Sequence, residues 1–579
     1  MFINYLYLNN KIINLDENYG FFLQILKKFN FIGYIAYISL VIFLQSCNSN
    51  FNKHPNEIII GISSDIESTN PLFSYTVNEG NISELLYMSL IQYKWDEKSG
   101  ELIDEPMLAK DWHWNSDSSS VTLYLRNDVY WSDGVPFTAA DVAFSYDLYS
   151  DPIIQSSRYG TFISFETDTS MHIDVSKTFE IESPFKIKIN FKKNIPPDLI
   201  DLTVPLIPKH IFQNIDRKNL ITIEKQIKPV TDGPFNFSEW QKNQAIILKS
   251  NDNSFLHKSS GAKEIIFKII PDYTSRITQL KEGEIDLTED VKAEDLKQLL
   301  TIKDLQLIPI KGREYDYLAW NNIDPDVYKK DNKSVPNKIF GDEKVREALT
   351  YAINRQEILH EFLKDQGELA SGPVAPIFKN AIDTLLMPLP FDPHKATKIL
   401  ADDGWKDINK SGILEKDGKK LSFSLYIPSG NPLRQFAATI IKNDLKEIGV
   451  DVKIETLEPQ VFFERMFKHE FDSWMAGWSV AIPLDMKSYW YSDLKKTPMN
   501  FSCYQNINAD KIILQIDSEK NKNIKNQLYK KLERIIYKDN PVTFLYWINN
   551  NVVYNKRIKD INISPLGAVY HAWNWALNN

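Results

Sequence analysis

The sequence predicts an α/β protein of two or three domains built on mixed sheets. Strand-like and helix-like segments alternate along the chain from residue 56 onward, which is the pattern of layered α/β domains. The chain has 579 residues, more than a single hydrophobic core usually organises. Hydrophobic residues make up 43% and charged residues 25%, a balance that excludes both a disordered chain and a multi-span membrane protein.

The first third of the chain carries clear strand and helix patterns. Short β-branched or alternating runs predict strands, and apolar residues at helical spacing predict a helix. The segments are a strand at 57–62, a helix at 81–93, and strands at 121–125 and 185–191. Between them, Asp133 and Gly134 predict a turn, and Thr138 with Asp141 predicts a helix that begins with a capping box.

The rest of the chain repeats this mixture. The predicted strands are 245–249, 264–270, 285–287, 421–427 and 450–456. The predicted helices are 274–281, 343–364, 393–401 and 433–448. There is no internal repeat and no low-complexity linker, so we expect the domains to be interwoven in sequence.

Charge and residue counts exclude several classes of function. The net charge of −9 provides no basic surface for nucleic acid. The two cysteines, Cys47 and Cys503, are too few for a disulfide framework or a cysteine-based metal site. The nine histidines are scattered, with none at metal-ligand spacing on a helix, and Gly418-Lys419 lacks the rest of a P-loop. We therefore expect no metal and no cofactor.

The first 46 residues predict a signal peptide. Lys27 and Lys28 precede an apolar run at 29–44, and the small residue Ser46 stands at the expected cleavage point. The alternative is a single transmembrane anchor. The apolar run of about 16 residues is shorter than the ~20 residues that a membrane span needs, which favours the signal peptide.

The cysteine that follows predicts a lipid anchor. The segment 44–47 resembles a bacterial lipobox, whose cysteine is acylated and becomes the mature N-terminus. Several acyl chains on Cys47 would hold the protein to a membrane more firmly than one chain. Residues 47–55 would form a polar tether. Because the prefix is long for a signal peptide, we expect translation to start between Phe21 and Lys27.

Residues 107–146 carry the longest recognisable motif in the chain. The motif consists of Leu108-Ala109, Trp112, Leu123, Leu125-Arg126, Trp131, Asp133-Gly134, Pro136, Thr138-Ala139 and Asp141-Val142. It resembles the signature of family 5 extracellular solute-binding proteins, the binding proteins of peptide and nickel ABC importers. Further blocks that resemble the family follow in order at 205–211, 231–240, 264–287, 315–321, 341–358, 391–405 and 472–478. The resemblance covers essentially the whole chain after residue 56.

The resemblance implies a two-lobed, Venus-flytrap binding protein of type II, cluster C, with three interwoven mixed α/β domains. Domain I would combine 56–83, 191–312 and 541–579. Domain II would be an insert at 84–190, and domain III would be 313–540. The lobes would close on a ligand about two crossover strands, at 313–320 and 541–547, and closure would exclude water from the ligand.

The resemblance also implies a function. The protein would be a lipid-anchored, extracytoplasmic, monomeric binding protein that delivers di- or oligopeptides to an ABC permease, with ATP hydrolysis on a separate subunit. A nickel chelate, an opine or an oligosaccharide are alternative ligands, and a surface hydrolase or sensor is an alternative role. The segment 477–481 approximates a G-x-S-x-G elbow, but Ala481 replaces the second glycine and Pro483 follows closely. We therefore expect no catalysis.

Ligand contacts are expected at two places. In peptide-binding relatives the ligand lies in the cleft as an added strand, with its main chain bonded to protein main chain. The resemblance places Trp478 and Ser479 in the wall of the cleft along which this added strand lies. Tyr75 and Asn78, in the loop after the first strand, stand where domain I usually contacts ligand.

The chain departs from the family where oligopeptide binders hold the charged ends of the peptide. Ala481 stands at the position of the usual ammonium-binding Asp, and Met475 and Met466 replace arginines. Asp485 is either a replacement carboxylate or a surface loop residue. Two nearby cations could replace the arginines, Arg465 and Lys468. Burying an unpaired ligand charge costs several kcal/mol, so these departures bear on which ligand is bound.

Overall fold

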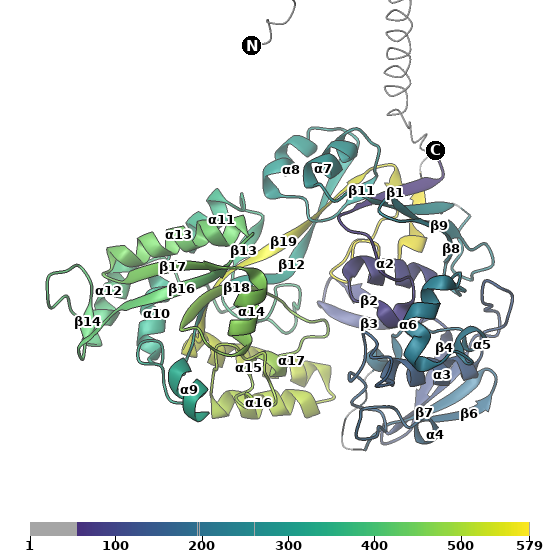
Figure 1. Cartoon of the computed structure of the whole chain (residues 1–579), viewed down its shortest axis with the longest axis horizontal. Helices are drawn as coiled ribbons and strands as arrows, with labels where there is room; N and C mark the ends of the chain where they lie inside the picture. Colours follow the sequence, from purple (N-terminus) through teal and green to yellow (C-terminus); the bar gives the residue numbers. More distant parts are fainter. Residues whose placement is uncertain (1–54, 194, 196, 198, 260, 578–579) are drawn as a thin grey trace, which may run out of the picture. The chain divides into compact units, whose positions relative to one another are not determined.

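The computed structural model describes residues 55–577 except 194, 196, 198 and 260 (Figure 1). The chain from Pro55 onward forms one compact unit. The expected signal peptide, the acylated Cys47 and residues 47–54 of the tether lie outside the described residues. Within the described residues, no helix is both long enough and apolar enough to span a bilayer.

One large mixed sheet organises the described chain. Its strand order is β17-β16-β18-β12-β19-β11-β1-β10-β9-β8, with β13 paired to β19. The strands are β1 (Glu57–Ile62), β8 (Phe235–Gln241), β9 (Ala245–Ser250), β10 (Glu264–Ile269), β11 (Leu287–Thr288), β12 (Leu305–Trp320), β13 (Gly367–Leu369), β16 (Ser422–Pro428), β17 (Asp451–Leu457), β18 (Ser473–Ser479) and β19 (Val542–Asn555). Parallel pairs such as β1–β10 and β16–β17 occur beside antiparallel pairs such as β12–β19. The predicted mixed α/β class is therefore confirmed.

The two longest strands connect the two halves of this sheet. β12 and β19 pair antiparallel from Leu305 opposite Asn555 to Ala319 opposite Val542, and Figure 1 shows them running side by side between the β16–β18 group and the β1, β8–β11 group. Their register shifts between Ile310 and Glu314. The expected crossover segments fall on these strands, except that Pro541 precedes β19, whereas the domain boundaries drawn above stay a prediction.

Helices flank the two groups of strands. Those of the β16–β18 group are α10 (Glu343–Tyr351), α11 (Arg355–Glu361), α12 (Pro393–Asp402), α13 (Pro432–Glu447), α14 (Pro459–Phe467), α15 (Lys487–Trp490), α16 (Ile507–Ser518) and α17 (Lys522–Asp539). Those of the other group include α2 (Val77–Leu86) and α7 (Tyr273–Lys281), whereas α3 (Ala139–Ser150) packs beside the strand Phe179–Ser183. The predicted capping box at Thr138 and Asp141 is confirmed at the start of α3.

Residues 91–190 build smaller sheets of their own. The hairpin β2 (Ile91–Asp96) and β3 (Glu101–Pro106) stands apart from a sheet of order β4-β5-β7-β6, formed by Ala109–Trp114, Ser120–Leu125, Lys186–Asn190 and Phe179–Ser183. The alternating pattern that predicts a strand at 121–125 is explained by burial, because Val121, Leu123 and Leu125 all face the core.

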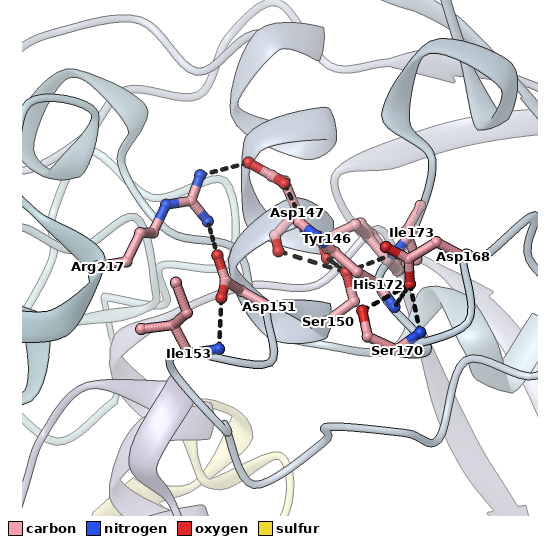
Figure 2. A network of polar contacts seen from close by, with 10 residues as sticks. All are labelled: Tyr146, Asp147, Ser150, Asp151, Ile153, Asp168, Ser170, His172, Ile173 and Arg217. Carbon is pink, nitrogen blue, oxygen red and sulfur yellow. Dashed lines mark hydrogen bonds and ion pairs between the residues drawn. The ribbon is translucent and has the colours of Figure 1, made fainter.

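An ion-pair network ties the end of α3 to the segment that follows this sheet (Figure 2). Arg217 donates to Asp147 at 2.6 Å and to Asp151 at 2.9 Å. His172 Nε2 lies 2.8 Å from the other carboxylate oxygen of Asp147. Ser150 Oγ donates to the carbonyl of Tyr146 within α3. These contacts hold the end of α3 against the segments around His172 and Arg217.

Two helix predictions are wrong in extent. The predicted helix 81–93 ends at Leu86, because Tyr87 is extended and the chain from Ile91 enters β2 with alternating burial. The predicted helix 343–364 is two helices. Asn354 ends the first by capping the second, since its side chain accepts a hydrogen bond from Glu357 N.

The tip of the β2–β3 hairpin is pressed against the loop at 377–380. Gly100 adopts φ +68°, and a Cβ there would lie 1.9 Å from the carbonyl oxygen of Ile377. Asn380 N donates to Ser99 O at 3.0 Å, and Trp95 contacts the ring of Phe378 edge-on at 5.9 Å between centroids. A residue with a side chain at position 100 would therefore force the hairpin off this loop.

We expect Gly100→Ala to destabilise the protein more than Gly134→Ala. Both glycines have a left-handed φ, which costs alanine about 1–2 kcal/mol. No heavy atom lies within 4 Å of a Cβ at position 134. Gly134→Ala is therefore destabilised only by its backbone conformation. Urea denaturation should show a loss at least 1 kcal/mol larger for Gly100→Ala, on the order of a typical steric core defect. Equal losses would contradict the tight approach of the hairpin.

Candidate ligand-binding site

One edge of β18 lacks a partner strand. β18 pairs with β12 along its whole length, but with β16 only at Ser473 and Trp474. Val480 N donates to Arg313 O at 2.8 Å. Because peptide groups alternate in direction along an antiparallel strand, the N–H and C=O groups of Gly477 and Ser479 point away from β12. These groups face the side on which no strand of the described chain is paired.

The two residues predicted at this wall lie on opposite faces of β18. Trp478 is half-buried, and its ring contacts those of Tyr489 and Phe501 at 4.4 and 5.9 Å between centroids. Ser479 is exposed and stands opposite Glu314 of β12. An extended ligand beside this edge would thus meet an aromatic wall on one face and polar groups on the other.

A buried ion pair fixes the main chain at Gly477. Arg434 of α13 donates from Nη2 to Asp316 Oδ1 of β12 at 2.8 Å, and the side chains are 18% and 2% exposed. A Cβ on Gly477 would lie 2.3 Å from Arg434 Nη2 and 2.5 Å from Asp316 Oδ1. A side chain at position 477 would therefore displace the ends of this ion pair. Burial raises the pKa of Asp316, and the charge of Arg434 opposes that rise.

Two carboxylates not singled out by the sequence, Glu314 and Asp290, interact near Ser479, and Glu289 is the neighbour of Asp290 in the chain. Burial raises the pKa of Glu314, and the charge of Asp290 adds to the rise. Burial also raises the pKa of Asp290, and it raises that of Glu289 to about 7. The neighbouring cation, Arg313, donates to the carbonyl of Val480 at 3.0 Å. This corner therefore favours a positively charged group.

These carboxylates come together because β11, β12 and β19, which are far apart in the sequence, pair in one sheet. Asp290 follows β11, and its N–H donates to Asn550 Oδ1 at 3.3 Å. Asn550 in turn stands opposite Ile310 of β12, near Glu314. The sequence indicates this carboxylate group only through the acidic residues directly after the predicted strand 285–287, a pattern that is common in loops.

Asp485 is engaged within its own loop. Its Oδ1 accepts hydrogen bonds from Lys487 N at 2.9 Å and Ser488 N at 3.2 Å, and its Oδ2 accepts one from Ser488 Oγ. The carboxylate thus caps the first turn of α15. Its predicted role as a ligand-binding carboxylate stays a prediction.

The two proposed replacement cations also have partners. Arg465 Nε lies 3.3 Å from a carboxylate oxygen of Glu470, and Lys468 Nζ lies 2.6 Å from one of Glu464. Both residues thus have a carboxylate partner in their own segment, and their role as replacement cations stays a prediction.

Tyr75 and Asn78 lie together on a different element. Tyr75 precedes α2, whereas Asn78 lies in the first turn of this helix and not in the loop predicted for it. Tyr75 is 63% exposed and donates from its hydroxyl to Gln155 O at 3.0 Å. Asn78 Nδ2 donates to the carbonyl and hydroxyl oxygens of Ser64, both at 3.1 Å. Among the described residues, no hydrogen bond or ring contact joins this pair to Trp478 or Ser479.

The surroundings of Ser479 do not form a nucleophile elbow. Ser479 ends β18, and the next helix, α15, begins only at Lys487. In the part of the chain that the structure describes, no three His, Cys, Asp or Glu side chains are placed to hold a metal ion. What the geometry offers is an open strand edge, an aromatic wall and a carboxylate corner, which is chemistry for binding.

Comparison with known proteins agrees with this geometry. Residues 105–501 match the family model described as bacterial extracellular solute-binding proteins, family 5 middle region. The oligopeptide-binding protein AppA of Bacillus subtilis is 30% identical over 557 residues, which covers 93% of this chain and 97% of AppA. The nickel-binding periplasmic protein of Escherichia coli is 27% identical over 411 residues, covering 71% and 73% of the two chains.

Solved structures show the same fold. The structure of Bacillus subtilis AppA in complex with a nonapeptide has a TM-score of 0.67 at 29% identity, and the match covers 90% of this chain and 99% of that one. NikZ of Campylobacter jejuni in complex with Ni(L-His) has a TM-score of 0.68 at 26% identity, covering 90% and 100%. These likenesses confirm the predicted two-lobed α/β fold.

Proposed function

The chain belongs to the bacterial extracellular solute-binding proteins of family 5, and from this premise we propose that it captures extended peptides for an ABC importer. The observation that carries the proposal is the open edge of β18 at Gly477 and Ser479, beside Trp478. An extended peptide can satisfy these peptide groups with its own main chain, as strand addition does in other peptide-binding proteins.

Binding through the main chain suits a receptor for peptides of many different sequences. Hydrogen bonds to peptide groups are independent of the ligand's side chains, so affinity does not depend on one sequence. The carboxylates of Asp290 and Glu314 lie near the same edge, and a bound cation would favour their ionised forms. We propose that they receive the ligand ammonium group that Ala481 cannot bind.

Delivery to the importer is proposed to follow from lobe closure. The lobes, divided at the boundaries given above, would rotate about β12 and β19 and bury the peptide. The closed monomer would then present it to the permease, while a separate ATPase subunit supplies the energy. Acylated Cys47 would hold the protein at the extracytoplasmic membrane surface. The protein itself would leave the peptide chemically unchanged.

A thermal-shift titration tests this proposal. Ligand that binds only the folded protein stabilises it by about 2.7 kcal/mol at a concentration 100-fold above its Kd. We expect nonapeptides to raise the melting temperature in a saturable way and to be recovered intact. Stabilisation by nickel–histidine, an opine or an oligosaccharide but by no peptide would overturn the peptide assignment, and cleaved peptide would overturn the binding role.

A further inference from the structure

Residues 384–391 form an exposed apolar loop between β13 and α12. Leu385, Met387 and Phe391 are 80%, 70% and 46% exposed. Single exposed apolar side chains are common on protein surfaces, but here three of them stand within seven consecutive residues. Apolar side chains that gather on a surface in this way mark a site of contact with a partner.

The main chain of this loop is fixed to α17. Asp383 N, at the start of the loop, donates to Glu533 Oε2 at 2.7 Å, and the hydroxyl of Tyr537 donates to Met387 O at 2.9 Å. Because these bonds involve main-chain groups of the loop, they hold it in place while the side chains of Leu385 and Met387 stay exposed. The apolar surface is therefore preformed, and a partner does not have to organise it.

A line of cations runs along α17 beside this loop. Lys530, Arg534 and Lys538 are spaced four residues apart, so they share one face of the helix. Arg534 forms an ion pair with Asp383 at the start of the loop, which places this cation line next to the apolar side chains. Lys530 and Lys538 take part in no ion pair with the residues that the structure describes. Their charges are therefore available to a partner.

The acidic side chains near the loop do not cancel the cation line. Asp383 is 4% exposed and already paired. Burial raises the pKa of Glu533 to about 8, so this carboxyl is largely protonated at neutral pH. Asp392 and Glu347 interact with Lys395, at the other end of the loop. The whole of α17 carries six Lys or Arg residues against two Asp or Glu, although the chain has a net charge of −9.

We propose that the loop 384–391 and the cation line of α17 together dock on a lipid bilayer that contains anionic phospholipid. Leu385 and Met387 enter the boundary between head groups and acyl chains, and the cations contact the phosphates, which is how interfacial membrane segments bind. A purely apolar protein partner would instead bury the cations unpaired, at a large cost. The inference does not rest on peptide capture, and it gives the folded chain a membrane contact separate from the acyl chains proposed at Cys47.

Vesicle flotation tests this inference. The chain from residue 48 onward contains the whole compact unit from Pro55 and lacks the expected signal peptide and Cys47, so neither can cause binding. It is mixed at low ionic strength with vesicles of phosphatidylcholine, with or without phosphatidylglycerol. We expect partitioning to be about tenfold stronger, or more, with phosphatidylglycerol. Raising the salt to about 1 M, where the screening length falls to about 3 Å, should remove this difference.

Two matched double variants locate the contact. Leu385→Ser with Met387→Ser removes the apolar side chains, keeps the cation line, and should weaken binding to phosphatidylglycerol vesicles about tenfold or more. Ile153→Ser with Ile163→Ser changes two side chains that are 55% and 54% exposed in another segment of the chain, and should keep binding within about twofold. All four positions are exposed, so both variants should fold, and circular dichroism checks this.

Several outcomes would overturn the inference. One is the absence of binding to either kind of vesicle, and another is unchanged binding by the folded Leu385 and Met387 double variant. Binding only to vesicles that also contain the permease would identify a protein partner instead of lipid. Dimerisation that this double variant abolishes, without any binding to vesicles, would identify a second copy of the chain. A retained response to nonapeptides in the same variant would show that its loss of vesicle binding is independent of the proposed function.

Discussion

Replacing Arg434 with methionine is expected to lower the free energy of unfolding by about 3–5 kcal/mol. The change leaves Asp316, 2% exposed, without its cation beneath Gly477. Urea denaturation followed by tryptophan fluorescence measures the loss. The matched control is Arg465→Met, whose pair with Glu470 is 33% and 20% exposed and is therefore expected to contribute less than ~1 kcal/mol.

The loss in Arg434→Met is expected to depend on pH. Burial raises the pKa of Asp316, and Arg434 is the charge that opposes this rise. Without Arg434, the folded state binds a proton at Asp316 more tightly than the unfolded chain does. Proton binding then favours folding, so the destabilisation is largest above the folded pKa and shrinks as pH falls through it. A loss below 1 kcal/mol, or one unchanged between pH 8 and pH 4, would contradict the account.

Replacing Ser479 with proline is expected to weaken peptide binding by about 10- to 100-fold, the equivalent of about 1.4–2.8 kcal/mol. Proline removes the outward N–H that we assign to the ligand main chain. Since this N–H faces away from β12, the pairing with β12 should survive. Calorimetric titration with a nonapeptide measures the effect.

Ser479→Ala is the control for this prediction. It removes the hydroxyl but keeps the N–H, so its affinity for the nonapeptide should stay within about twofold of the original, a difference below ~0.5 kcal/mol. Both variants should melt within a few degrees of the unaltered protein. A proline variant that is folded and binds the peptide with unchanged affinity would show that the β18 edge does not receive the ligand.

Hydrophobic periodicity predicts the buried strands well, because the pattern of a strand is contained in a few consecutive residues. The run at 57–62 becomes β1, and the alternation at 185–191 becomes β7. The failures come from tertiary context. Helical spacing continues past Leu86, but the chain there turns into the β2–β3 hairpin. Likewise Asn354 interrupts a continuous apolar face by capping a new helix.

The motif suggested one part of the candidate site, whereas the part that depends on strand pairing was hidden in the sequence. The resemblance placed Trp478 and Ser479 on the wall that has an open edge. It did not reveal that Asp485 caps α15, where it accepts hydrogen bonds from Lys487 N and from the N–H and hydroxyl of Ser488. The resemblance also did not predict that Asp290 lies near Glu314. This proximity depends on the pairing of β11 and β12 with β19.

Calorimetric titration of the purified protein with a nonapeptide, followed by mass spectrometry of the recovered ligand, is the measurement that bears most directly on peptide capture by this chain. Saturable binding of one peptide per chain, with the peptide returned at its original mass, is the predicted result. No heat of binding with any peptide, or fragments in place of the intact ligand, would contradict it.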